Sequence, residues 1–279
     1  MNVKIAAVGS SSLIAEEIRD IARALLSERL PVILRRTEEI TDDRSADLYL
    51  CARTQYEQLS HIIPRERLFL MELQPDSTFF FAISRIPAGS DVYIFNNHIA
   101  YPKELAAYCR TLGMDQVNYI PLAFEELPKE DLLRILSNAP YIIGVDRFVN
   151  LLKQPPYAAV LRPDVQIIAG KRTASLRSAF AVLRSLAGIL LDDLRARWHS
   201  EAHSPVQLRE IAADVDSAID ILQAGTIRTV VSQAAIAEPD SIPAAHTHRE
   251  LPPERLQDYI SERLELLQFL HEKIDALKK

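Results

Sequence analysis

The sequence contains few cysteines, few glycines and no long apolar run, and each shortage excludes a class of protein. Two cysteines, Cys51 and Cys109, in 279 residues argue against a disulfide framework and favour the cytoplasm. Seven glycines disfavour folds built on several glycine-rich phosphate loops. No apolar run reaches the ~18–20 residues of a membrane helix, and the first residues lack the basic-then-apolar order of a signal peptide. We therefore expect a cytoplasmic protein that makes no membrane contact.

Motifs that announce a known chemistry are also missing. The sequence has no GxGxxG or GxxxxGK[ST] phosphate motif and no GxSxG or HExxH catalytic motif. His199 and His203 flank Glu201 at helical spacing, but two imidazoles alone do not make a metal site. We therefore expect no cofactor and no metal. Catalysis is left open, with a non-catalytic role favoured.

Charge and apolar content indicate an ordinary folded protein. The 32 Lys+Arg and 38 Asp+Glu residues give a net charge of -6, and hydrophobic residues make up 48%, which excludes full disorder. The mildly acidic balance argues against a general nucleic-acid surface. At ~100–200 residues per domain, this length predicts one or two domains.

Up to about residue 190, short β-branched runs alternate with stretches of helical spacing. This alternation predicts an α/β fold with mostly parallel strands. The rhythm restarts near residue 90, which favours two Rossmann-like parallel-sheet lobes in tandem over one doubly wound sheet. Strands are expected at 3–8, 31–34, 47–51, 68–71, 78–83, 92–95, 117–120, 141–144 and 165–168, and helices at 12–29, 54–62, 103–112, 128–138 and 173–197.

A helical C-terminal region follows the two lobes. Its last segment has apolar residues at alternating steps of four and three from Leu256 to Leu277, a heptad pattern interrupted at Arg263. This stripe forms either a coiled coil, giving a homodimer through Glu254–Lys279, or an amphipathic helix packed on its own chain. The expected parts are lobe 1 (1–90), lobe 2 (91–197), a helical segment (198–237), a proline-rich linker (238–253) and the final helix (254–279).

Several predicted strands end in small hydroxyl or basic residues that suit an anion. The backbone N–H groups at a helix start favour negative charge, and arginine pairs well with carboxylate or phosphate. In α/β folds, ligands gather at the carboxyl ends of the strands. Serine caps and solvated cations are the alternative explanation. The candidates are Ser10, Ser11 and Ser12 after the first strand, Arg53 and Thr54 after the third, and Lys171, Arg172, Thr173 and Ser175 around the start of the long helix.

Three further polar residues follow predicted strands of the second lobe. The amides of Asn96 and Asn97 could bind a polar ligand, although Asn is also common in turns. Asp146 could accept from a hydroxyl or an amine of a ligand, or it could serve only to pair with its surroundings. We predict that all three belong to the ligand site.

This layout resembles the effector-binding region of bacterial transcription regulators of the propionate-regulator type, which is similar to the periplasmic-binding-protein fold. The resemblance covers about residues 3–195 and is strongest over Leu105–Ser175, with Tyr141-Ile142-Ile143-Gly144 and Gly170-Lys171-Arg172-Thr173-Ala174-Ser175. It implies a small metabolite held between two lobes and a helix that carries the signal to an output domain. That family's ATP-driven motor and DNA-binding helix pair have no counterpart in this sequence.

Three functional hypotheses follow. The favoured one is a non-catalytic regulatory module that binds a small anionic metabolite in a cleft between the lobes and signals through the C-terminal helices, without contacting nucleic acid. The second is an enzyme acting on a phosphorylated or nucleotide substrate, with Asp146, His98 or Glu72 as the reacting group. The third is an adaptor that uses the heptad helix to bind a partner.

Overall fold

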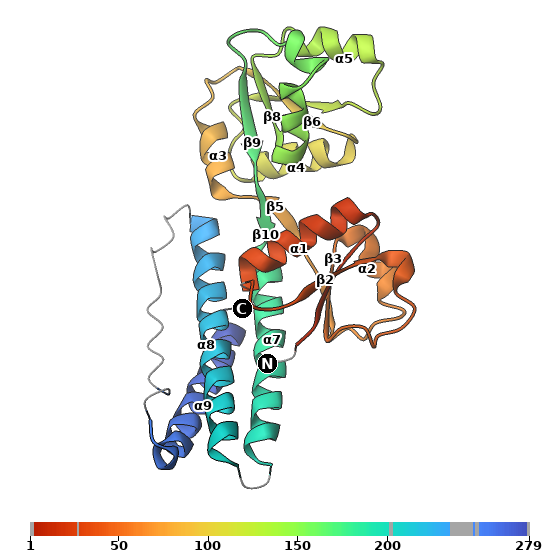
Figure 1. Cartoon of the computed structure of the whole chain (residues 1–279). Helices are drawn as coiled ribbons and strands as arrows, with labels where there is room; N and C mark the ends of the chain where they lie inside the picture. The colour runs from red at the N-terminus through yellow and green to blue at the C-terminus, as the bar shows by residue number, and fades with distance from the viewer. Residues whose placement is uncertain (1–2, 27, 201–202, 235–247, 249–250, 278–279) are drawn as a thin grey trace. The chain divides into compact units, whose positions relative to one another are not determined.

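The computed structural model describes residues 3–26, 28–200, 203–234, 248 and 251–277. The chain divides into two compact units (Figure 1): unit 1 comprises Met1–Leu73 and Ala174–Lys279, and unit 2 comprises Gln74–Thr173. Unit 2 is therefore an insertion within the chain of unit 1. The two connections run through strands β5 (Leu73–Pro75) and β10 (Arg172–Ala174), which pair with each other.

Unit 1 contains a four-stranded sheet of order β2-β1-β3-β4. The neighbouring strands run parallel throughout. All five residues of β1 are buried, as expected for a strand that is covered on both faces. The strands are β1 (Ile5–Gly9), β2 (Val32–Arg36), β3 (Leu48–Cys51) and β4 (Leu68–Leu70), with helices α1 (Ser12–Leu26) and α2 (Arg53–Leu59) and the short 3-10 helix η1 (Thr37–Glu39) between them.

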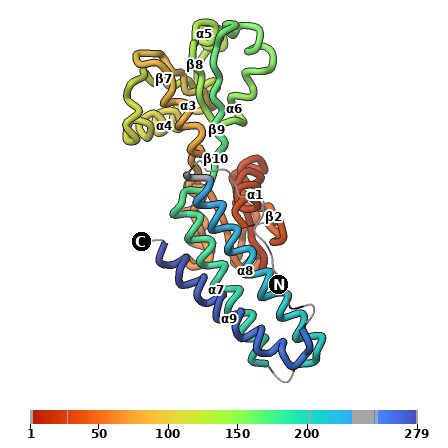
Figure 2. The backbone as a smooth tube through the Cα atoms, turned by 90° about the vertical axis from the view of Figure 1, so that its left-hand side faces the viewer, coloured from red at the N-terminus to blue at the C-terminus, as the bar shows by residue number. Residues whose placement is uncertain are grey.

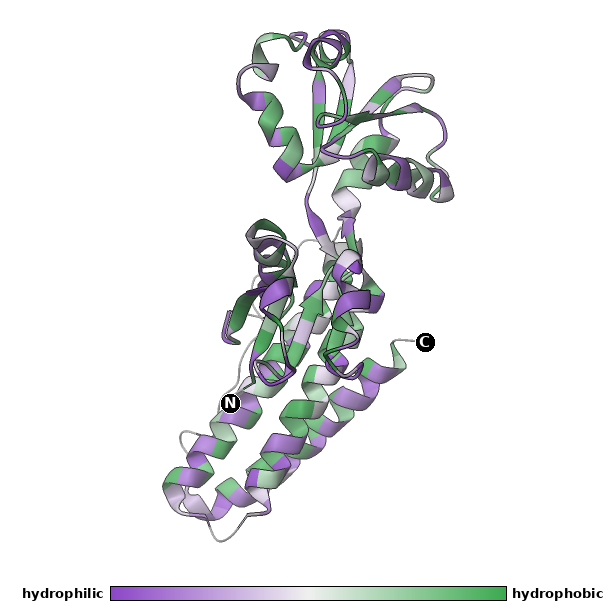
Figure 3. Ribbon diagram, turned by 90° about the vertical axis from the view of Figure 1, so that its right-hand side faces the viewer, coloured by the Kyte–Doolittle hydropathy of each residue, from purple (hydrophilic) through white to green (hydrophobic). Residues whose placement is uncertain are grey.

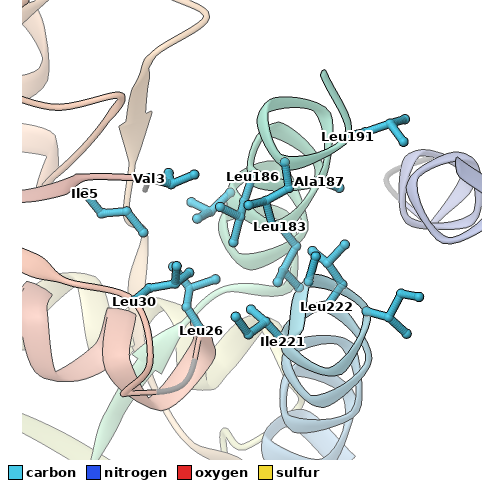
Figure 4. Close-up of a cluster of buried hydrophobic side chains, with 14 of the residues drawn as sticks. Val3, Ile5, Leu26, Leu30, Leu183, Leu186, Ala187, Leu191, Ile221 and Leu222 are labelled. Atoms are coloured by element: carbon cyan, nitrogen blue, oxygen red, sulfur yellow. The ribbon is translucent and has the colours of Figure 1, made fainter. Parts of the chain in front are cut away.

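Three long helices complete unit 1. Helices α7 (Leu176–Trp198), α8 (Pro205–Ala234) and α9 (Pro253–Ala276) lie side by side (Figures 1 and 2) and pack against one another. Their hydrophobic and hydrophilic residues alternate along each helix (Figure 3). Val3 and Leu26, from the α/β part, face Leu183 and Leu222, from the helices, in one buried cluster (Figure 4). The sheet and the helices of unit 1 therefore share one hydrophobic core.

Unit 2 contains a second parallel sheet, of order β7-β6-β8-β9. With the sheet of unit 1, it confirms the predicted α/β class with two parallel sheets and C-terminal helices. The strands are β6 (Asp91–Asn96), β7 (Asn118–Ala123), β8 (Tyr141–Val145) and β9 (Gln166–Gly170). The helices are α3 (Ser77–Ser84), α4 (Ala100–Thr111), α5 (Lys129–Leu136) and α6 (Asp146–Val149), followed by η2 (Asn150–Lys153) and η3 (Tyr157–Ala159).

One predicted strand is wrong, because residues 78–83 lie in helix α3. The Asp76 side chain caps this helix by accepting a hydrogen bond from Phe79 N at 3.1 Å. A Cβ atom added to Gly170 would lie 2.8 Å from the Phe79 ring, so the phenyl group packs directly on the glycine of β9. A short apolar run does not distinguish a buried strand from a buried helix, and the aspartate cap was the signal that could have decided.

The compact units divide the chain differently from the predicted lobes, 1–90 and 91–197. Unit 2 already begins at Gln74, and α7 packs with α8 and α9 in unit 1 rather than with the second sheet. Within the predicted helical segment 198–237, α8 spans Pro205–Ala234. Most of the predicted linker, 238–253, lies outside the described residues.

The heptad stripe of α9 packs inside its own chain. Leu256, Ile260, Leu267 and Ile274 are almost completely buried in the core of unit 1. The structure therefore agrees with the amphipathic-helix alternative. A homodimer through Glu254–Lys279 stays a prediction, and the buried stripe gives it no support.

Arg263, the interruption of the heptad, belongs to a buried ionic cluster. Its Nε donates to Asp216 Oδ1 of α8 at 2.7 Å, and Asp216 is only 1% exposed. The same carboxylate interacts with His248 Nδ1 at 2.7 Å and accepts from the Tyr259 hydroxyl at 2.9 Å. We call these four residues the Asp216 cluster, and it fastens residue 248 and α9 to α8.

Among the helices that the structure describes, none has both the length and the apolar character that a bilayer crossing demands.

Candidate functional site

The turn after β1 is a close approach that only glycine allows. A Cβ atom at Gly9 would lie 2.4 Å from Ala15 N and 2.9 Å from Ser11 O. Ser11 begins the helix, because its carbonyl accepts from Ala15 N at 3.1 Å and its hydroxyl lies 3.5 Å from Ile14 N. The capping alternative thus accounts for Ser11. The neighbouring Ser10 and Ser12 are exposed.

The structure brings this turn and Arg53 to the same sheet edge, as predicted. Strands β1 and β3 are parallel neighbours with Val8 opposite Cys51, so the chain leaves both strands at the carboxyl edge of the sheet. The Arg53 side chain is 82% exposed, and its Nη2 lies 3.9 Å from Glu72 Oε1. At that distance and exposure the ion pair is weak, so the guanidinium can engage a ligand.

Beside Arg53, Gln55 carries a buried amide that sequence reasoning missed. Gln55 is 5% exposed, and its Oε1 has no hydrogen-bond partner among the described residues. Its Nε2 donates to Thr54 Oγ1. A hydroxyl can also donate, so a half-turn of the amide keeps this bond and leaves Nε2 as the free donor instead. In either orientation, one buried amide atom has no hydrogen-bond partner among the described residues.

The residues after β2 lie at the same carboxyl edge, next to the end of β1. Thr37 is buried, and its hydroxyl donates to Gly9 O at 3.1 Å, which holds the serine turn in place. Arg36 is engaged by Glu38 at 2.7 Å and by Glu39 at 3.0 Å. Hydrogen bonds from the Arg36 backbone and side chain lower the pKa of Glu39. Arg36 is thus held by two carboxylates, whereas Arg53 faces one distant carboxylate.

The predicted polar residues of the second lobe meet at the carboxyl edge of the unit 2 sheet. Strands β6 and β8 are parallel neighbours, and they end at Asn96 and just before Asp146. Asn96 is 5% exposed, and its Nδ2 donates to Asn97 Oδ1 at 3.1 Å and to His98 O at 3.4 Å. Asn96 Oδ1 is without a hydrogen-bond partner among the described residues. Asp146 is half-buried, and its Oδ1 accepts from Arg147 N at 2.6 Å.

The third predicted group, 171–175, lies on β10 and at the cap of α7 rather than in the first turn of a helix. The helix was expected to begin at 173, but β10 intervenes and α7 begins at Leu176. Ser175 caps α7 by accepting from Ser178 N at 3.2 Å, and its hydroxyl donates to Glu72 Oε2 at 3.1 Å. The Ser175 hydroxyl is therefore engaged by a carboxylate of the same chain.

The other members of that group point to different roles. Lys171 is exposed, and its carbonyl accepts from Asp76 N at 3.0 Å within unit 2. The Arg172 guanidinium lies over the Tyr101 ring, 5.8 Å from its centroid. Thr173 is half-buried at the unit boundary. These side chains are therefore not gathered at the start of a helix as the sequence predicted.

The described cysteines are buried, and His98 and His203 lie beside carboxylates and an aromatic ring. Burial raises the pKa of the Cys51 thiol to about 12, so it is a neutral core group at ordinary pH. His98 lies 3.4 Å from Glu125 and 3.3 Å from Glu126. The His203 ring stacks on Trp198 at 5.5 Å, and Glu201 lies outside the described residues. Within the described part of the chain, no three His, Cys, Asp or Glu side chains are grouped to hold a metal.

Comparisons with known proteins give no information on the function of this chain. No family model matches the sequence, and neither a curated protein nor a solved structure matches it. The resemblance to the sensor regions of transcription regulators therefore stays a prediction.

Proposed function

We propose that this chain is a non-catalytic regulatory module that binds a small anionic metabolite at the carboxyl edge of the unit 1 sheet. The observation that carries the proposal is the buried amide of Gln55, which keeps one unsatisfied polar atom in the first turn of α2, two residues after Arg53. An unsatisfied buried polar group costs about 1–3 kcal/mol. A ligand that pairs with it removes this cost.

The charge around this edge supports an anion as the ligand. Helix α1 begins at Ser12 without an acidic residue in its first turn, so its positive end is not neutralised locally. Arg53 contributes an exposed guanidinium, and a hydrogen bond between charged partners is worth about 1.5–3 kcal/mol. Ser10 and Ser12 add hydroxyl donors. Phosphate and carboxylate groups use all of these contacts.

Helix α1 offers a physical route from this edge to the C-terminal helices. The helix starts at the serine turn, and its far end packs on α8. A Cβ atom at Gly225 of α8 would lie 2.9 Å from Leu25 O, and Arg228 Nη1 donates to Ala24 O at 3.4 Å. A shift of α1 on ligand binding would therefore change the packing of α8. This proposal uses unit 1 alone, and the cleft between the lobes stays a prediction.

The test is a thermal-shift screen of the full chain against small anionic metabolites: phosphates, carboxylates and nucleotides. A ligand at about 100 times its Kd adds ~2.7 kcal/mol to the folded state, which is easily visible. Arg53→Ser is expected to weaken a hit by about tenfold or more, because one charged hydrogen bond is lost.

Arg23→Ser is the matched control for this experiment. Arg23 is exposed in the last turn of α1, at the opposite end from the serine turn, and its removal changes the net charge equally. Its affinity for the hit should equal that of the wild type. If no compound stabilises the wild type, or if Arg53→Ser binds the hit as well as the control does, the anion site is wrong.

A further inference from the structure

Arg53 and Glu72 follow neighbouring strands of the unit 1 sheet and lie opposite each other. Strands β3 and β4 are parallel, with Cys51 opposite Leu70. Met71 N donates to Cys51 O at 2.8 Å just beyond these last paired residues. Continued by two residues, the same register sets Arg53 opposite Glu72, and Arg53 Nη2 lies 3.9 Å from Glu72 Oε1. The register of the sheet therefore brings a guanidinium and a carboxylate to one stretch of the carboxyl edge.

Hydrogen bonds to the start of α7 hold Glu72 in place. Its Oε2 accepts from the Ser175 hydroxyl at 3.1 Å. Its backbone N–H donates to Ser178 Oγ at 3.0 Å, and its backbone O accepts from Ser175 N at 2.7 Å. The carboxylate is thus anchored through one oxygen, while the other oxygen, Oε1, is the one near Arg53. A group that is fixed before a ligand arrives loses little conformational entropy on binding.

The pair that these two side chains form is loose. Arg53 is 82% exposed and Glu72 37% exposed in their side chains, and 3.9 Å separates the closest atoms. By contrast, the Arg36 guanidinium, at the same edge, lies 2.7 Å from Glu38. An exposed pair as long as that of Arg53 and Glu72 contributes little stability. Both charges are therefore open to a ligand at a small cost to the fold.

The strand order decides which charges a ligand at this edge needs. In the order β2-β1-β3-β4, the serine turn follows β1, Arg53 follows β3 and Glu72 follows β4. Groups that favour an anion therefore lie on one side, and a carboxylate lies on the other. Glu72 repels a simple anion that is bound to Arg53, but it attracts a positive group next to that anion. A ligand that carries both charges fits this order better than an anion alone.

We propose that the unit 1 edge binds a free amino acid, whose carboxylate pairs with Arg53 and whose ammonium group pairs with Glu72. The four charges then alternate in sign, so each charged group of the ligand meets its opposite. This inference rests on the proposed anion site and names the class of its ligand. Acidic amino acids satisfy both proposals, because they carry an ammonium group and still have a net negative charge.

The experiment compares amino acids with the acids that lack only the amino group, by calorimetric titration of the full chain. L-glutamate is paired with glutarate, and L-aspartate is paired with succinate. At least one amino acid should bind the wild type about fivefold more tightly than its paired acid, because its ammonium group gains a charged hydrogen bond to Glu72. Glu72→Gln should remove this preference, because the amide still offers an acceptor to Ser175 but carries no charge.

Glu66→Gln is the matched control. Glu66 is exposed and precedes β4, at the opposite end of the same strand, so its substitution removes an equal charge. This variant should keep the wild-type preference for the amino acid. The amino acid assignment is overturned if the wild type binds both members of each pair equally well, or if Glu72→Gln keeps the preference.

The anion site can survive the failure of this inference. Equal binding of an amino acid and its paired acid, both weakened by Arg53→Ser, overturns the amino acid assignment and supports the anion site. The same holds if none of the four compounds binds but a phosphate from the thermal-shift screen does. A screen in which no anion binds overturns both proposals.

A second measurement needs only the wild-type chain, in case Glu72→Gln does not fold. With carbon-13 labelling, the side-chain carboxyl resonance of Glu72 should shift further at saturation with the amino acid than with its paired acid. The carboxyl resonance of Glu66 should not move with either compound. Equal shifts of the Glu72 resonance in the two titrations would also overturn the amino acid assignment.

Discussion

Two of the buried polar side chains of unit 1, Asp216 and Gln55, differ in how many hydrogen-bond partners they have. Asp216 is 1% exposed and has partners on His248, Tyr259 and Arg263, all within 3.0 Å. Gln55 is 5% exposed and uses one half of its amide, while the other half has no partner among the described residues. Both groups lost water on folding. Only the Asp216 cluster recovers those hydrogen bonds within the chain.

The two groups differ in what their hydrogen bonds do for the fold. A buried polar group with all its partners holds elements together, and the Asp216 cluster joins α8 to α9 and to residue 248 in this way. A buried polar group with a missing partner is costly, and under the proposed function a ligand supplies the partner of Gln55. Gln55 in unit 1 and Asn96 in unit 2 each have one such atom among the described residues.

The largest effect is expected when the Asp216 cluster is broken. Asp216→Ala leaves the Arg263 guanidinium partly buried without its carboxylate, so the free energy of unfolding should fall by about 3–5 kcal/mol. Urea denaturation measures this loss. Asp220→Ala, one turn further along α8, removes a carboxylate that lies 3.6 Å from the exposed Arg29 and should cost less than about 1 kcal/mol. Equal losses for the two variants would mean that the cluster is not structural.

Substitution of Gln55 should change the stability little and weaken ligand binding instead. Gln55→Leu removes an amide that is only half satisfied, so the free energy of unfolding should change by less than about 1 kcal/mol or should rise. Binding of an anionic hit should weaken at the same time. Urea denaturation measures the free energy of unfolding, and calorimetric titration measures the affinity for the anionic hit. A loss of stability as large as that of Asp216→Ala would erase the distinction between the two sites.

The smallest effect is expected at Cys51, which lies in β3 behind the edge. Burial raises the pKa of its thiol to about 12 from the ordinary 9.0, so almost no thiolate exists at pH 8. Labelling with a thiol reagent should therefore be negligible in the folded chain, with or without ligand. Because the folded pKa is the higher one, the stability that this thiol contributes is lost as the pH rises above 9.0. Rapid labelling of native Cys51 would show that its thiol is accessible to solvent, which contradicts its burial.

Much of the fold was predictable because it depends on local periodicity. Apolar strands and amphipathic helices identified both parallel sheets, and parallel pairing placed Ser10–Ser12 beside Arg53. Residues 78–83 were misassigned because an apolar run alone does not separate a strand from a helix. The helix start expected at 173 was wrong because residues 172–174 form β10, which pairs with β5, a segment about a hundred residues earlier, and such pairing leaves no local signal.

The remaining features depend on contacts between distant segments. Arg263 looked like a defect in the heptad, and its reason lies at Asp216, on another helix. Gln55 was not selected, because its sequence neighbours do not reveal that its amide is buried. His248 appeared only as a linker residue, although it belongs to the same buried cluster.

The most direct test of the central claim is a titration of the isotopically labelled full chain with the strongest anionic hit, followed by nuclear magnetic resonance. The account predicts that the Gln55 side-chain amide and the backbone amides of Ser10 and Ser12 shift first and most. Resonances of the Asp216 cluster should move less, and only through the packing of α1 on α8. A bound anion that leaves the Gln55 amide unshifted would contradict the account.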